Sequence, residues 1–125
     1  MKVREIYADE FGETHFRIAE YPYSLQDFAP PSAPAAVSKH IPVTTAVFMQ
    51  VPPGWDPDFH CTPRRQLLFT IAGRITMSVS DGATIEGFPG GMPILLNDLV
   101  GKGHQTMVQG DEPATFLLVG LGENS

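Results

Sequence analysis

Short runs of apolar residues, separated by residues that favour turns, dominate the chain. Residues 14–19 (THFRIA) and 74–80 (RITMSVS) alternate polar and apolar side chains, which predicts strands with one buried face. Residues 66–72 (QLLFTIA) have a continuous apolar centre, which predicts a strand buried on both faces. The Asp81-Gly82 pair then follows the second alternating run and is typical of a tight β-hairpin turn.

Further strands are expected between the glycine and proline breaks, over residues 44–51, 84–88, 93–97, 104–109 and 115–119. About eight short strands, with no helical periodicity and no internal repeat, predict an all-β fold that is either a closed barrel or a double sheet. A chain of 125 residues, of which 42% are hydrophobic, is the size of one domain with a buried core.

Residues 21–37 (YPYSLQDFAPPSAPAAV) interrupt this pattern with four prolines. Proline fixes φ and removes a backbone donor, so we expect an extended connection with one short turn of helix. A solvated linker would not need the apolar side chains of this segment, so we expect an arm that lies across the barrel or a neighbouring subunit. We therefore divide the single domain into an N-terminal strand and arm, residues 1–43, and a barrel core, residues 44–121.

Charge and cysteine content narrow the classes of partner. Fourteen acidic and eight basic residues give a net charge of −6, which offers little counter-charge to nucleic acid. No run approaches the roughly 18 apolar residues of a membrane span, and the first residues do not resemble an export signal. The single cysteine, Cys61, excludes an internal disulfide. We expect a soluble cytoplasmic protein that binds neither nucleic acid nor membranes.

Two segments carry glycine and histidine at a characteristic spacing. The first contains Gly54, His60, Thr62, Gln66 and Gly73, and the second contains Gly101 and His104. The first segment resembles the first motif of the cupin superfamily, and the second segment resembles the second motif. The strings HCTPRRQ and NDLVGKGH are similar to sequences found in small single-domain bacterial cupins. The resemblance implies a jelly-roll β-barrel, a double-stranded antiparallel β-helix, with a small-molecule site at its mouth.

In cupins with complete motifs, three histidines and one glutamate bind a divalent metal. The resemblance therefore implies His60, Gln66 and His104 as metal ligands, with Thr62 standing where a further histidine would be. Iron, nickel, manganese or zinc is the expected ion, although two imidazoles and one amide form a neutral and weaker donor set. The alternative is that both histidines are ordinary hydrogen-bonded residues. No glycine-rich phosphate loop is present, so no nucleotide cofactor is expected.

Asp98, six residues before His104, is the carboxylate of greatest interest. If it faces the pocket, it supplies an anionic ligand or orients a histidine as a general base. If it faces the following loop, it accepts hydrogen bonds from the amides of residues 100–103, a role that needs no special geometry. We include His60, His104 and Asp98 as candidate catalytic residues.

Three further residues are candidates for binding the substrate: Thr62, Arg64 and Phe69. A guanidinium at Arg64 would clamp a substrate carboxylate, because Arg64 shares the parity of His60 if the chain stays extended. The alternative for Arg64 is a solvated side chain or a partner for Asp56 or Asp58. Phe69 would line the pocket, although aromatic residues in a barrel more often belong to the core.

These residues predict a small-molecule enzyme that acts on a polar organic acid or carbonyl compound, with a divalent metal that polarises an oxygen. The first alternative is metal-free proton transfer by His60 or His104, as in an isomerase or epimerase. The second is a binding or sensing module without turnover, since a fold does not determine a reaction. The resemblance and the apolar arm together lead us to expect a homodimer.

Overall fold

The computed structural model of the chain describes residues 1–123 and 125, and the secondary structure of these residues consists of eleven strands. They are β1 (Lys2–Ala8), β2 (Thr14–Glu20), β3 (Tyr23–Gln26), β4 (Ala35–Ser38), β5 (Val43–Val51), β6 (Gln66–Ala72), β7 (Ile75–Val79), β8 (Thr84–Gly87), β9 (Ile94–Leu96), β10 (His104–Val108) and β11 (Ala114–Leu121). The predicted all-β class is confirmed. Among these residues, none forms a helix of the length and apolar character that a membrane crossing would require.

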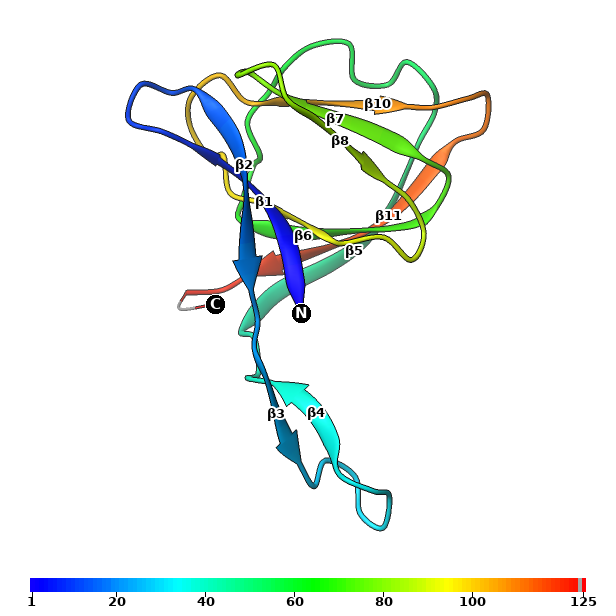
Figure 1. Cartoon of the computed structure of the whole chain (residues 1–125). Helices are drawn as coiled ribbons and strands as arrows, with labels where there is room; N and C mark the ends of the chain where they lie inside the picture. The colour runs from blue at the N-terminus through cyan, green and yellow to red at the C-terminus, as the bar shows by residue number, and fades with distance from the viewer. Residues whose placement is uncertain (124) are drawn as a thin grey trace.

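Two sheets face each other and enclose the core (Figure 1). The larger has six strands in the order β2-β1-β9-β6-β11-β5, and the smaller has three in the order β10-β7-β8. Their pairing is antiparallel except between β1 and β9. Backbone pairing among the described residues does not close these sheets into a barrel. The structure therefore supports the double-sheet form of the prediction, and the jelly-roll topology stays a prediction.

The core between the sheets comes from alternate residues of the strands that flank it. Eleven buried side chains form this cluster: Ile6, Val51, Leu68, Ile75, Met77, Val79, Ile94, Leu96, Ala114, Phe116 and Leu118. A smaller cluster of Val3, Leu67 and Leu95 lies on the opposite, outer face of the six-stranded sheet. The predicted strands over residues 66–72 and 115–119 therefore carry apolar side chains on both faces, as a continuous apolar run implies.

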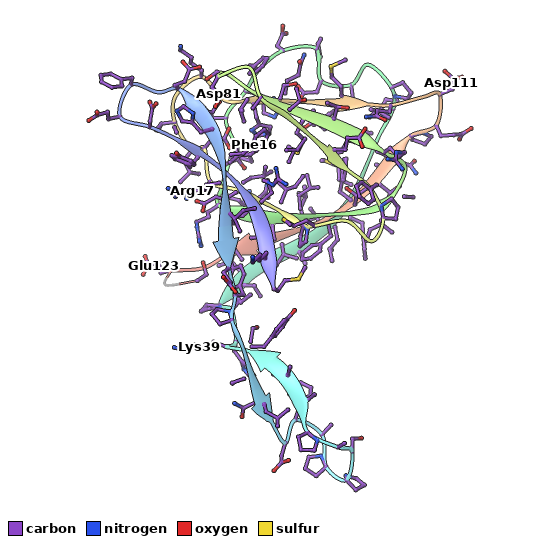
Figure 2. All side chains as sticks on the ribbon, viewed as in Figure 1. Phe16, Arg17, Lys39, Asp81, Asp111 and Glu123 are labelled. Atoms are coloured by element: carbon purple, nitrogen blue, oxygen red, sulfur yellow. The ribbon has the colours of Figure 1, made fainter. Side chains whose placement is uncertain are left out.

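The first strand begins at Lys2, so the expectation that the first strand starts at Thr14 was wrong. Charged residues obscure the alternation of polar and apolar side chains along β1. The hydrogen-bond partners of one of them, Glu5, lie in later segments of the chain. Arg17, labelled in Figure 2, donates to both carboxylate oxygens of Glu5, and Asn97 donates to one of them. Burial alone would raise the pKa of Glu5, but these bonds outweigh it and hold the pKa below its ordinary value of 4.5.

The proline-rich segment forms a hairpin of β3 and β4, with Tyr23 paired to Ser38 and Gln26 to Ala35. The turn of helix expected there is absent, and the segment does not lie across its own sheets. Figure 1 shows the hairpin standing away from the rest of the molecule, and every residue of β3 is exposed. Proline lies at the base and in the loop of this hairpin, outside the paired positions, where a missing amide donor costs no ladder bond.

His15 links the two sheets at the end near the β7–β8 turn. Its Nε2 lies 2.7 Å from Asp9 Oδ2, and its Nδ1 lies 2.8 Å from Asp81 Oδ2. The side-chain hydrogen bonds to Asp9 and Asp81 raise the pKa of His15 above its ordinary value of 6.5. A protonated ring can donate to both carboxylates at once, so this contact joins β2 to the β7–β8 turn most firmly when His15 is charged.

The His15 contact gives the stability of the fold a defined pH dependence. Because the pKa of His15 is raised in the folded state, its contribution to the free energy of unfolding is complete below pH 6.5. This contribution is lost as the pH rises through the pKa of His15 in the folded state. We expect the urea midpoint of the wild type to exceed that of His15→Gln at pH 6, with the difference shrinking at higher pH. A difference that stays constant or grows with pH would contradict this assignment.

Candidate functional site

The two motif histidines face each other across an isolated antiparallel bridge. The backbone N–H of His60 donates to the carbonyl of His104, and the reverse bond is also made, each at 2.9 Å. Residues that exchange both bonds carry their side chains on the same face, and the ring centroids are 5.0 Å apart. The structure therefore brings together two imidazoles that lie 44 residues apart in the sequence.

Asp98 orients the inner imidazole. Its Oδ2 lies 2.6 Å from His104 Nδ1, and the exposed fractions of the two side chains are 0% and 4%. Asp98 Oδ1 is also buried and makes no hydrogen bond within residues 1–123 and 125. Of the two roles considered for Asp98, the structure shows the side chain paired with His104. This bond places a proton on Nδ1 and leaves Nε2 of a neutral His104 as an acceptor.

Asp56 lies beside the outer imidazole. Asp56 Oδ1 lies 3.1 Å from His60 Nδ1, and its Oδ2 accepts a hydrogen bond of 3.0 Å from the backbone N–H of Thr106. The His60 side chain is 44% exposed, and the edge of Trp55 meets it at 6.3 Å between centroids. From the sequence alone, Asp56 was expected only as a partner for Arg64. Its position four residues before a motif histidine was the available signal.

The side chains of Thr62 and Gln66 are buried and bond to one another. Gln66 Nε2 donates to Thr62 Oγ1 at 3.2 Å, and that hydroxyl donates to the carbonyl of Arg64 at 2.8 Å. The backbone N–H of Thr62 donates to the carbonyl of Asp98 at 3.2 Å, which ties this segment to the second motif. These bonds give Thr62 a structural role.

The structure does not bring Arg64 or Phe69 to the histidines. The chain bends at residues 63–64, so the parity argument for Arg64 fails, and its guanidinium lies 3.5 Å from Thr45 Oγ1 in β5. Phe69 is an odd number of residues from Gln66 along β6, so it lies on the outer face and packs with Leu67. The prediction that Phe69 lines the site was wrong because strand alternation turns it away.

The donor atoms fit a resident divalent metal only in part. With each Nδ1 facing a carboxylate, the two Nε2 atoms make no hydrogen bond to any described residue, an arrangement that also occurs around metal-bound histidine. The remaining donor is the Gln66 amide oxygen, so the set is neutral. No group of three or more histidine, cysteine, aspartate or glutamate side chains within the described chain is placed to share an ion. We derive no chemical step through a metal, which stays a prediction.

The site thus consists of two imidazoles side by side, a buried one bonded to Asp98 and an exposed one with Asp56 beside it. Such a pair can accept a proton at one Nε2 and donate one at the other. No protein-family model matches this chain. No curated protein matches it either, so the relation to cupins stays a resemblance of motif spacing.

Proposed function

We propose that the chain is a small-molecule enzyme that moves a proton within a carbonyl compound. His104 is the general base, Asp98 orients it, and His60 exchanges a proton with the carbonyl oxygen. The pairing of Asp98 Oδ2 with His104 Nδ1 at 2.6 Å, in a buried position, carries this proposal. A carboxylate in that position fixes the tautomer of the imidazole and stabilises the cation that forms when Nε2 takes a proton.

The reaction follows from the spacing of the two rings. His104 Nε2 removes a proton from the carbon beside the carbonyl, and protonated His60 donates to the carbonyl oxygen, which gives an enol or enediol. Return of a proton to the neighbouring carbon, with loss of one from oxygen, yields the isomer without net consumption of protons. Both rings lie on one face and 5.0 Å apart, which suits transfer between adjacent atoms of one molecule.

The substrate class follows from the polarity and position of the rings. The His60 side chain is 44% exposed, so a small polar molecule reaches the outer ring of the pair directly from solvent. The expected substrates are 2-oxo acids, hydroxy ketones and short sugars, whose carbonyl groups make the neighbouring C–H acidic. The resemblance to cupins supports this choice, since that superfamily includes metal-free sugar epimerases.

Hydrogen exchange at carbon tests the proposal directly. The tag-free protein is incubated in D2O with a panel of 2-oxo acids, hydroxy ketones and short sugars, and proton NMR follows deuterium entry beside the carbonyl. We expect catalysed exchange with at least one compound, reduced about a hundredfold or more in Asp98→Asn. Asp111→Asn, an exposed change in the loop before β11, is the matched control and should retain full activity.

Three outcomes separate the proposal from its alternatives. Exchange that persists in His104→Gln would exclude that residue as the base. Exchange that is lost on chelation and restored by iron, nickel, manganese or zinc would favour the predicted metal enzyme. A panel member that binds in calorimetry without any exchange would favour a binding module. The proposal requires exchange that survives chelation and depends on His104.

A further inference from the structure

Arg4 carries a positive charge toward the space between the two sheets. It lies two residues before Ile6 on β1 and pairs with Ile94 of β9, and both of these side chains belong to the core cluster between the sheets. Strand alternation therefore turns the Arg4 side chain to the same inner face. An ionised side chain on such a face normally has a partner that compensates its charge.

No described residue supplies a partner for the Arg4 side chain. Every other arginine of the chain donates a side-chain hydrogen bond to another residue. The Arg4 side chain, in contrast, makes no hydrogen bond or ion pair with any residue that the structure describes. Solvent does not reach Arg4 Nε, so this donor has lost water without gaining an acceptor. The burial of Nε also holds the guanidinium in place, and its charge is uncompensated.

A cavity of about 330 Å³ lies beside this guanidinium. Its walls come from β1, from β8 and from the segment that follows β8: Arg4, Thr84, Ile85, Glu86, Phe88 and Met92. The two sheets are open at this place, because Ile18, which pairs with Arg4 on β2, is 49% exposed although it shares the inner face. The cavity is therefore accessible from solvent, and none of its wall residues belongs to the histidine site.

Arg74 organises the wall of the cavity that β8 provides. Its guanidinium lies 3.5 Å from Glu86 Oε2 and 5.1 Å from the centre of the Phe88 ring. Gln109 Nε2 donates to the other carboxylate oxygen of Glu86 at 3.4 Å. These contacts hold the Glu86 carboxylate away from ion-pair distance of Arg4, and the Phe88 ring is left as an apolar surface beside the cavity.

We propose that this cavity binds a small organic monocarboxylate, with its carboxylate on Arg4 and its apolar part against Phe88 and the other apolar wall residues. A guanidinium matches the two oxygens of a carboxylate, and the apolar wall favours a short alkyl or aryl group. One negative charge fits better than two, because the Glu86 carboxylate in the same wall repels a dianion such as phosphate. This site is independent of the chemistry at His60 and His104.

Nitrogen–proton NMR of the Arg4 side chain tests the site directly. The Nε–H signal of Arg4 is assigned by its loss in Arg4→Gln. The wild type is then titrated with hexanoate and benzoate, and separately with the neutral hexanamide and benzamide. We expect a saturable shift of the Arg4 signal with at least one carboxylate and no shift with the amides. The ring signals of His60 and His104 should stay in place, and phosphate should bind at least tenfold more weakly than the carboxylate.

Charge variants identify the groups that bind the carboxylate. In calorimetry, Arg4→Gln should weaken binding at least tenfold, because it removes the charged donor. Arg64→Gln is the matched control, since it removes the same charge beside Thr45, outside the cavity, and it should bind as the wild type does. Glu86→Gln should tighten binding by about two- to fivefold, because it removes the only carboxylate of the wall.

Four results would overturn the proposal. They are an Arg4 signal that neither carboxylate moves, an amide that binds as well as its acid, phosphate that binds more tightly than the carboxylates, and histidine signals that shift while the Arg4 signal does not. If circular dichroism shows that Arg4→Gln does not fold, Arg4→Lys replaces it, because lysine keeps the charge and loses the planar fork. Affinity equal to that of the wild type in the folded variant would also overturn the role of Arg4.

Discussion

Replacement of Gly103 by alanine is expected to lower the free energy of unfolding by about 3–5 kcal/mol, in the range of severe single substitutions. Gly103 has φ of +77°, and a Cβ at this position would overlap the carbonyl carbon and oxygen of His60. Those atoms are backbone and form the bridge to His104, so they cannot move without breaking it. The substitution therefore separates the two imidazoles as it destabilises the fold.

Gly82→Ala provides a matched control for Gly103→Ala. Gly82 has φ of +97° in the β7–β8 turn, and no atom lies within 4 Å of a Cβ placed there. Gly82→Ala should lower the free energy of unfolding by only about 1–2 kcal/mol, which is the cost of a left-handed backbone at a residue with a Cβ. Urea unfolding of both variants measures the difference, and histidine NMR reports whether the ring environments change. An equal decrease in the free energy of unfolding at the two positions would show that the close approach of Gly103 to His60 does not contribute to the loss of stability.

Asp98→Ala is expected to lower the free energy of unfolding by about 2–3 kcal/mol, the range for leaving a buried polar partner without a hydrogen bond. His104 Nδ1 would lose its partner in a place that solvent does not reach, since the side chain is 4% exposed. Asp56→Ala should lower the free energy of unfolding by less than Asp98→Ala, because water can replace the carboxylate beside the exposed ring of His60. Urea unfolding measures the two losses.

Nitrogen NMR of the imidazoles gives a readout that a general loss of packing would not produce. In the wild type, a neutral His104 should carry its proton on Nδ1, because Asp98 accepts from that atom. In Asp98→Ala this preference should disappear, while the tautomer of His60 stays as it was. An unchanged His104 tautomer in Asp98→Ala would remove the basis for assigning Asp98 as its orienting residue.

The sequence predicted most of the two facing sheets because their strands follow simple alternation. The run RITMSVS became β7, with Ile75, Met77 and Val79 buried as the period of two requires. The Asp81-Gly82 pair forms the turn that follows it. The motif spacing also placed His60 and His104 together, although nothing in that spacing indicates which carboxylate each ring contacts.

The features that the sequence did not predict depend on contacts between distant residues. The strand at residues 2–8 was not predicted, because Arg17, which neutralises Glu5, and Asn97, which donates a hydrogen bond to it, cannot be assigned to Glu5 before the sheet is known. The side chain of Arg64 was predicted to face the site because the sequence carries no strong local signal for the bend at residues 63–64. For Asp98 the sequence favoured the role in the following loop, which needs no special geometry, but its side chain is paired with the ring of His104.

The position of β1 in the six-stranded sheet also affects how the chain folds. β1 pairs with β2 through a short hairpin, but its other edge pairs with β9, where Ile6 lies opposite Leu96. During synthesis the β1–β2 hairpin emerges before β9, so its inner edge stays open until β9 leaves the ribosome. Pairings of such long sequence separation slow the folding of small β proteins. Binding of chaperones to nascent chains should accordingly end only after residues 94–96 have emerged.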